Sequence, residues 1–396
     1  MNGMSAQLPP GSGARGEVTR RHNLSTVLTL LHRGSQPRSQ LTARTGLNRS
    51  TVAALIAELA DLGLAYESEP DPTRQVGRPS PMAHADPRAV AIAVNPEVDA
   101  ITIGVVGLDG RVAKRIRYET ETAPTVKEFI KLSSAIIEGL RGEFEGNGTV
   151  VGIGVAVPGL VRAEDGLVRL APHLDWHDEP VTALLSDATG FPVWTGNDAS
   201  LGALAEQIYG AGRGVSDLIY LNGGASGIGG GIIVGGVPLA GRAGYAGEFG
   251  HVRVDTGAAG DPREAGSLES QVNRADLLHA LGLASADADT LDSALLTSTD
   301  PAVGALVRRQ LESLSTSLRN AVNVLNPEVI VLGGFLGSIF GADPEFLIDQ
   351  VRGQTLEASF EGTSITRAQL GSDLLMIGAA ELAFASLLAD PAATAG

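Results

Sequence analysis

Three neighbouring residues near the N-terminus have side chains suited to reading DNA. Arg49, Ser50 and Thr51 follow a glycine turn and begin a segment with helical spacing of apolar residues. When the N-terminal end of such a helix enters the major groove, an arginine there can read O6 and N7 of guanine, and hydroxyls can reach phosphates or base edges. A small helical bundle used for dimerisation is the alternative, but packing does not require polar residues at this place. The triplet therefore favours DNA binding.

Three helices must position this triplet, and the sequence predicts all three. Leucine and valine residues recur at helical spacing within residues 20–33. A short second helix, capped by Ser39, ends at Gly46, and either Asn48 or Ser50 caps the third. Two helices joined by a glycine turn form a helix-turn-helix. The apolar residues that lock its helices together are Leu41, Leu47, Val52, Leu55 and Ile56.

Residues around the triplet supply further candidate DNA contacts. Arg38 and Arg44 are suited to phosphates, which position a protein on the duplex without reading its sequence. The segment Gly77-Arg78-Pro79 is either an arm that places one arginine in a narrow minor groove or an ordinary linker turn. The candidate DNA-binding residues are Arg38, Arg44, Asn48, Arg49, Ser50, Thr51 and Arg78.

Charge is distributed unevenly along the 396 residues. Residues 1–90 carry ten Arg and seven Asp or Glu, a net charge of +3. The remaining residues carry 19 Lys or Arg and 38 Asp or Glu, a net charge of −19. DNA would repel this acidic part, so only the N-terminal part is a plausible docking surface.

Composition excludes several classes of site. The chain contains no cysteine, which excludes disulfides, thiolate metal sites and cysteine nucleophiles. Its first residues do not resemble a secretory signal, and no run of about 18 uncharged apolar residues predicts a membrane span. Residues 374–389 are apolar but contain Glu381, which indicates a packed helix. We therefore expect a cytoplasmic protein with no membrane partner.

After residue 85, apolar strands alternate with helices, a pattern typical of an α/β body with mixed sheets. Glycine-rich segments at residues 152–161, 222–232 and 326–335 follow or join these strands. Glycine allows backbone N–H groups to approach a ligand, including a phosphate. These segments therefore indicate ligand binding between strand ends.

Together with Asn197-Asp198-Ala199 and Gly247-Glu-Phe-Gly-His251, these segments have an order and spacing that resemble the ROK family of repressors, open reading frames and sugar kinases. The resemblance covers about residues 20–390. The helix-turn-helix resembles that of the repressor branch, which includes xylose and N-acetylglucosamine repressors. The resemblance implies a winged helix-turn-helix followed by an actin-like ATPase fold, with two α/β lobes around a cleft.

The resemblance also implies roles for individual residues. Asp198 matches the general base that accepts a proton from a sugar hydroxyl in kinases of the family. Asn197, Glu248, His251 and Glu269 match residues that hydrogen-bond sugar hydroxyls, which need both donors and acceptors. The alternative is that these groups are surface or capping residues. The candidate ligand-binding residues are Gly159, His173, Asn197, Asp198, Glu248, His251 and Glu269.

One departure from the family concerns phosphate binding. Family kinases have an Asp-x-Gly-x-Thr type turn after the first strand of the body, where this chain has Asn95-Pro-Glu97-Val-Asp99. Two carboxylates would face a triphosphate, and each such charge pair is unfavourable by about 1 kcal/mol at 4 Å even in water. We therefore expect no ATP binding in the usual mode, and no chemistry at Asp198.

A second departure concerns zinc. Many family members bind zinc through a cysteine-rich segment, where this chain has Gly260, Pro262 and Ser267. A structural zinc site needs about four ligands, so we expect no metal, and no cofactor. His251 then either donates to a ligand hydroxyl or is only structural. His173 stands where the family often has Asn near the sugar, which leaves the identity of the ligand open.

Three functions follow from these observations. The first is a transcriptional repressor that binds double-stranded operator DNA, as a homodimer or homotetramer, and responds to a sugar or sugar-derived effector. The second is an ATP-dependent sugar kinase with an accessory DNA-binding domain. The third is a regulator without a sugar ligand. We expect a disordered tail at residues 1–16, a winged helix-turn-helix at 17–84, a first lobe at 85–200 with the final helix 374–390, and a second lobe at 201–373.

Overall fold

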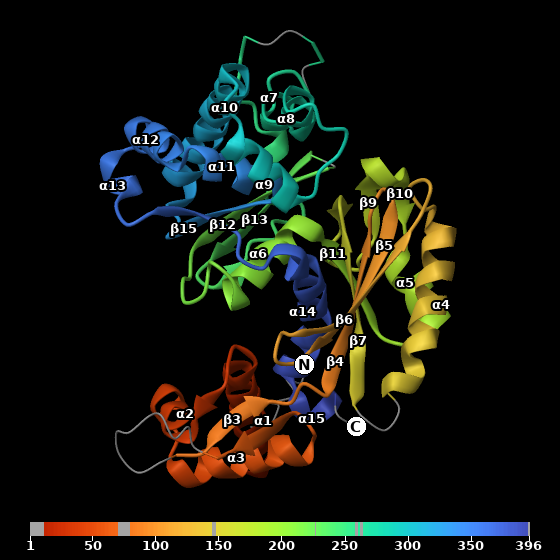
Figure 1. Cartoon of the computed structure of the whole chain (residues 1–396). Helices are drawn as coiled ribbons and strands as arrows, with labels where there is room; N and C mark the ends of the chain where they lie inside the picture. Colours follow the sequence, from red (N-terminus) through yellow and green to blue (C-terminus); the bar gives the residue numbers. More distant parts are fainter. Residues whose placement is uncertain are drawn as a thin grey trace, which may run out of the picture.

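The computed structural model describes residues 12–69, 80–144, 148–225, 227–257, 260–261 and 264–394. A small N-terminal head lies at the bottom of Figure 1, and a body with two five-stranded sheets lies above it. Residues 1–11 of the expected tail lie outside the described residues. Helix α1 begins at Ser12, inside the segment for which we expected disorder.

The head comprises residues 12–69 and 80–85. It contains three helices and an antiparallel sheet of order β1-β3-β2. The regularly spaced leucine and valine side chains of α1 are buried in a core shared with α2 and α3. The elements are α1 (Ser12–His32), β1 (Gln36–Pro37), α2 (Arg38–Thr45), α3 (Arg49–Asp61), β2 (Ala65–Ser68) and β3 (Met82–Ala85).

The turn between α2 and α3 has the features that the sequence predicted. Gly46 has a φ of 70°, a left-handed conformation that favours glycine, and its N–H donates to the Thr42 carbonyl. Asn48 caps α3, because its side-chain oxygen accepts a 2.8 Å hydrogen bond from the Thr51 N–H. The turn therefore fixes the start of α3 at Arg49.

The expected cap of α2 is wrong. Helix α2 begins at Arg38, directly after Pro37, and no side chain caps it. Ser39 therefore lies within the helix. The pairing of β1 with β3 brings the Arg38 N–H to 3.1 Å from the Pro81 carbonyl, so this strand pairing fixes where α2 begins.

The first sheet of the body has the order β11-β7-β4-β5-β6. Helices α4 and α5 cover one face and α14 covers the other (Figure 1). The α14 face is lined by small residues because the helix packs closely: a Cβ at Gly154 would lie 1.7 Å from the Ala379 carbonyl oxygen. The elements are β4 (Ala89–Pro96), β5 (Ala100–Gly107), β6 (Val112–Glu119), α4 (Val126–Phe144), β7 (Thr149–Val157), α5 (Val181–Thr189), β11 (Val193–Asn197) and α14 (Leu374–Ala389).

The second sheet has the order β14-β13-β12-β15-β16. Helices α10 and α11 pack with one face, where Ile219 and Ile330 point, whereas α6 packs on the other face, where Tyr220 and Val331 point. The elements are α6 (Asp198–Tyr209), β12 (Leu218–Gly224), β13 (Gly227–Val234), β14 (Val237–Pro238), α10 (Pro301–Leu325), β15 (Val329–Gly333), α11 (Gly334–Ala342) and β16 (Ser364–Arg367).

Helices α6 and α14 pack against each other between the two sheets (Figure 1). Residues 371–389 are long and apolar enough to cross a membrane by length and composition alone. In the structure, however, α14 packs on β7, β4 and α6, and its Glu381 is buried. This agrees with the prediction of a packed helix.

Shorter elements complete the body. A small antiparallel sheet, β8-β9-β10, lies beside the first sheet (Figure 1) and was not predicted from the sequence. The remaining elements are β8 (Leu160–Val161), β9 (Val168–Ala171), β10 (Trp176–Glu179), α7 (Leu268–Gln271), α8 (Arg274–Ala280), α9 (Ala288–Thr297), α12 (Pro344–Gln354), α13 (Glu357–Phe360) and α15 (Pro391–Thr394).

Candidate functional site

Asn197 and Asp198 lie where β11 ends and α6 begins, between the two sheets. Asn197 caps α6 by accepting from the Ser200 N–H at 2.8 Å, and its amide donates to the Gly159 carbonyl at 3.0 Å. Burial, together with the nearby Glu248 carboxylate, raises the pKa of Asp198 to about 7. At neutral pH, Asp198 can therefore either accept or donate a hydrogen bond to a hydroxyl group.

Glu248, His251 and Glu269 form a second group of polar side chains. Glu248 precedes a 3-10 turn at Phe249–His251, and Glu269 lies on α7, which Ser267 caps. The His251 Nδ1 lies 3.4 Å from Glu269 Oε1. Burial and the Glu269 carboxylate raise the pKa of Glu248 against the opposing effect of His251. The two groups are close enough for Asp198 and Glu248 to influence each other, and together they offer the donors and acceptors that a polyhydroxyl ligand needs.

Gly159 is adjacent to this site through its hydrogen bond with Asn197, whereas His173 has no polar contact with the described residues of the site. A Cβ on Gly159 would lie 2.3 Å from the Leu170 carbonyl oxygen, so the close approach requires glycine. His173 lies in a 3-10 turn at Pro172–Leu174 and is exposed. It makes no hydrogen bond or ion pair with the residues that the structure describes.

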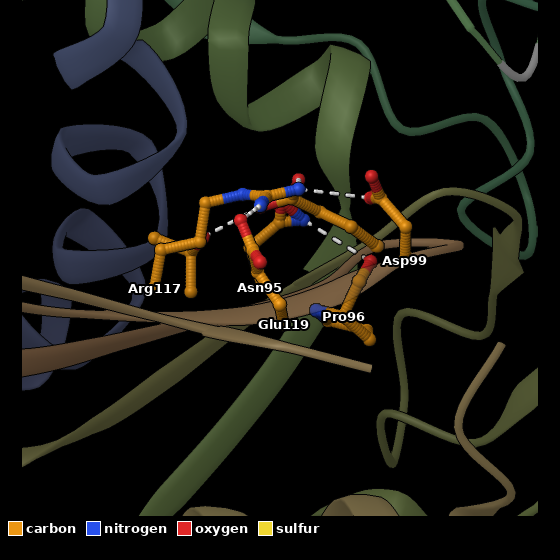
Figure 2. A network of polar contacts seen from close by, with 7 residues as sticks. Asn95, Pro96, Asp99, Arg117 and Glu119 are labelled. Carbon is orange, nitrogen blue, oxygen red and sulfur yellow. Dashed lines mark hydrogen bonds and ion pairs between the residues drawn. The ribbon is translucent and has the colours of Figure 1, made fainter. Parts of the chain in front are cut away.

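The turn expected to repel phosphate contains an ion-pair network (Figure 2). Arg117 of β6 lies 2.9 Å from Asp99 Oδ1, 3.2 Å from Glu119 Oε1 and 3.4 Å from Glu97 Oε2. Three carboxylates surround one guanidinium, so the turn keeps an excess of negative charge.

The backbone of this turn is also fixed internally. The Thr102 hydroxyl donates to Glu97 Oε1 at 2.6 Å, and the Glu97 N–H donates to the Ala100 carbonyl at 2.8 Å. Asn95 is buried, and its amide lies 3.3 Å from the Pro96 carbonyl oxygen (Figure 2). These bonds occupy polar groups that would otherwise be available to a ligand.

Arg117 was missed by sequence reasoning, and the hairpin turn gives only an approximate signal for it. The Asp109-Gly110 turn fixes the register of β5 and β6 and pairs Thr102 with Arg117. A register shift between Val105 and Val106 lies between the turn and this pair, so counting back from the pair Val106–Val112 would have placed Ile116, not Arg117, opposite Thr102.

The two other glycine-rich segments meet at the ends of β12 and β15. Gly334 has a φ of 56°, and a Cβ there would lie 2.0 Å from the Gly223 carbonyl oxygen. Only glycine fits such a close backbone approach at this φ. The two segments therefore form a close backbone contact where β12 and β15 end.

At the other end of the molecule, the start of α3 is accessible. Arg49 is exposed and makes no ion pair or side-chain hydrogen bond with the described residues. The Ser50 hydroxyl donates to the Asn48 side chain at 2.7 Å, so both side chains hold the helix start. Thr51 is half-buried beside them.

The remaining candidates for DNA contact differ in availability. Arg38 forms an ion pair with Glu67 of β2, and Arg44 donates to the Gln36 side chain at 3.3 Å. Both arginines already have side-chain partners with which a phosphate would compete. Arg78 lies outside the described residues.

Comparison with known proteins identifies the body. The model of the ROK family matches residues 91–386. The chain belongs to the ROK family. Its body has the actin-like fold of the family's sugar kinases.

ROK regulators and ROK kinases match this chain over different lengths. The xylose repressor of Caldicellulosiruptor bescii is 25% identical over 93% of this chain and 97% of its own length. The glucokinase of Thermotoga maritima is 28% identical over 98% of its own length but only 75% of this chain. A solved ROK transcriptional regulator, a homologue of the E. coli MLC protein, matches 95% of this chain and 99% of its own, with a TM-score of 0.77 and 20% identity. About a quarter of the chain therefore has no counterpart in the kinase.

Proposed function

We propose that this ROK protein is a sequence-specific transcriptional repressor whose body binds a sugar or sugar-derived effector without phosphorylating it. The observation that carries the proposal is the exposed start of α3, where Arg49 is unpaired among the described residues. A xylose repressor matches this chain over almost its whole length. We propose a winged helix-turn-helix at residues 17–84, a first lobe at 85–200 with 374–390, and a second lobe at 201–373.

Geometry and charge support DNA binding by the head. Helix α3 is held by Asn48 and by its apolar face, so its first turn is rigid before DNA arrives. A rigid helix start can present Arg49 to guanine and hydroxyls to the backbone of the duplex. The basic head and acidic body would orient the protein with α3 toward DNA. Two copies are needed to read enough base pairs, so we propose a cytoplasmic homodimer or homotetramer on a two-fold symmetric operator.

The polar groups between the lobes support a sugar effector. Asn197, Asp198, Glu248, His251 and Glu269 provide an amide, three carboxylates and an imidazole over a short distance. Such a set can satisfy several hydroxyls of one sugar. Gly159 would bring its backbone close to the sugar. His173 would contact the sugar only after its exposed turn moves.

Sugar phosphorylation is the alternative function. Asp198 and the adjoining glycine turns favour it, and glucokinases match the body at an identity similar to that of the repressors. The phosphate turn argues against it, because Arg117 is already paired and three carboxylates remain beside it. A triphosphate would have to displace this network and face its negative charge.

A selection experiment tests the proposal. Full-length protein is used to select duplexes from a random pool at about 50 mM salt, where phosphate contacts are strong. The bound sequences are then titrated with D-xylose, D-glucose and N-acetyl-D-glucosamine. We expect a two-fold symmetric consensus and a change in affinity with at least one sugar. Absence of any duplex affinity would contradict the proposal, and ATP-dependent phosphorylation lost in Asp198→Asn would favour the kinase.

A further inference from the structure

His32, the last residue of α1, is buried where the head meets the body. Its Nδ1 lies 2.6 Å from the Leu108 carbonyl oxygen, and its Nε2 lies 3.0 Å from both carboxylate oxygens of Glu381 on α14. The Leu108 carbonyl only accepts, so Nδ1 carries a proton, and Nε2 donates to the Glu381 carboxylate when His32 is protonated on both nitrogens. The side chains of His32 and Glu381 are 1% and 4% exposed. The head is thus joined to the body by a buried His–Glu contact, which is an ion pair when His32 is protonated.

Tyr209, the last residue of α6, completes this contact. Its hydroxyl donates to the backbone carbonyl of His32 at 3.0 Å, and its ring meets the imidazole edge-on with centroids 5.6 Å apart. A Cβ on Gly110 would lie 2.4 Å from the Tyr209 ring, so the β5–β6 turn closes over the other side. The end of α6 cannot move without disturbing the end of α1.

The other end of α6 is Asp198, in the proposed sugar site. The helix has 12 residues and spans about 17 Å. Tight packing makes it move as one body: a Cβ at Gly378 of α14 would lie 2.5 Å from the Leu201 carbonyl oxygen. A single rigid helix therefore connects the sugar site to the joint with the head.

A buried carboxylate ties the same helix to the segment before α14. Glu206 is fully buried and accepts from the backbone N–H groups of Gln369 and Leu370 at 2.9 and 3.0 Å. It also accepts from the Ala211 N–H at 2.7 Å. Movement of α6 would thus carry the start of α14 with it, and α14 carries Glu381.

We infer that α6 transmits the state of the sugar site to the head, with the cluster of Tyr209, His32 and Glu381 as its joint. The inference rests on the proposed function and adds the route of regulation. Effector contacts at Asp198 would shift α6 as a rigid element, and the joint would convert this shift into a different position of the head.

Hydrogen–deuterium exchange tests the route without requiring a known sugar or operator. The readout is exchange in peptides covering residues 20–34 of the full-length protein. The variants are wild type, Asp198→Asn, Tyr209→Phe and the double variant. Tyr220→Phe is the control, because Tyr220 is a buried tyrosine whose hydroxyl bonds within the body, 3.1 Å from Asn222 Oδ1. Glu269→Gln alters the sugar site without touching α6.

We expect Asp198→Asn to change exchange in the last turn of α1 by about fivefold or more, the lower end of usual allosteric coupling. In the Tyr209→Phe background, Asp198→Asn should change exchange in the last turn of α1 by less than about twofold. Tyr220→Phe should preserve the effect of Asp198→Asn, and Glu269→Gln alone should leave α1 unchanged. An unchanged α1 in Asp198→Asn, or equal effects in both tyrosine backgrounds, would overturn the inference.

A DNA-binding arm separates this inference from the proposed function. With a selected duplex and a sugar that binds, Tyr209→Phe should keep its sugar affinity and its DNA affinity but lose the sugar-dependent change of about 5- to 150-fold. If the protein binds neither sugar nor DNA, the proposed function is contradicted but the route is not, because the exchange experiment tests the route without either ligand. A Tyr209→Phe variant that responds to sugar like the wild type contradicts the route.

Discussion

Arg117 on β6 holds Asp99 of the β4–β5 turn at 2.9 Å (Figure 2). From the sequence, we expect this turn to correspond to the phosphate-binding turn of family kinases. The same guanidinium pairs with Glu97 and Glu119. We propose that a turn that receives an anion in family kinases here supplies its own cation and a surplus of carboxylates. The account of a sensor without kinase chemistry depends on this replacement.

Removing the carboxylates of the turn should increase nucleotide affinity. Glu97→Gly with Asp99→Thr deletes two repulsive partners of a triphosphate, each unfavourable by about 1 kcal/mol. We expect ATP to bind roughly 10- to 30-fold more tightly than to wild type, measured by calorimetry. Glu119→Gln, which removes the third partner of Arg117 at an 83% exposed position, should increase affinity less than the double substitution. Tight ATP binding by the wild type would contradict this reading of the turn.

Arg49 should carry sequence readout, whereas Arg44 should carry only affinity. Arg49→Ala is expected to lower affinity for the selected duplex by about 1–3 kcal/mol and to relax preference at one base pair. Arg44→Ala should weaken binding to all duplexes alike. It should also reduce by about one the slope of log affinity against log salt concentration. Anisotropy titrations at several salt concentrations measure both. Equal losses on selected and scrambled duplexes for Arg49→Ala would contradict its role.

Asp198 should destabilise the folded protein at neutral and alkaline pH. Its pKa is raised to about 7 by burial and Glu248, so the folded state favours the neutral carboxyl. The resulting stabilisation is fully present below the unfolded pKa near 3.8 and is lost as the pH rises to about 7. The difference in free energy of unfolding between Asp198→Asn and the wild type should therefore increase in favour of the variant from pH 4 to about pH 7. Above pH 7 this difference should stay constant. Chemical denaturation at each pH tests this, and a variant less stable than wild type at pH 8 would refute it.

The joint between head and body should weaken at alkaline pH. Burial lowers the pKa of His32, but Glu381 and the Leu108 carbonyl outweigh it and raise the pKa above 6.5. The contribution of the ion pair to the free energy of unfolding is complete below pH 6.5. It is lost as the pH rises through the raised pKa of His32. Glu381→Gln should lower the free energy of unfolding by about 3 kcal/mol at pH 6 and abolish this part of the pH dependence. Parallel pH curves for the variant and the wild type would show that the pair does not titrate as described.

Local patterns in the sequence were sufficient for the three helices of the head, for its strand β2 and for the main strands of the body, but not for β1 and β3. The spacing of Leu24 and Leu28 predicted α1, and Gly46 and Asn48 marked the turn and the start of α3. Ser39 was misplaced because pairing between β1 and β3, a long-range contact, decides where α2 begins. Strands β8 to β10 were missed because they are short and border glycine and proline turns.

Resemblance to a family predicted which polar residues to examine, but not how they are connected. Asn197 and Asp198 lie together because they are adjacent at the start of α6, which Asn197 caps. Arg117 lies beside the β4–β5 turn because of the strand register between β5 and β6, which the sequence alone does not specify. His32 and Glu381 are 349 residues apart, so no local pattern could indicate their contact.

Operator affinity measured with sugar alone, in the absence of ATP, tests the central claim most directly. Fluorescence anisotropy of a selected duplex with the full-length protein should show a change of about 5- to 150-fold when the effective sugar among D-xylose, D-glucose and N-acetyl-D-glucosamine is added. The sugar should be recovered unmodified. Unchanged operator affinity with every sugar, together with accumulation of a sugar phosphate once ATP is supplied, would contradict the account.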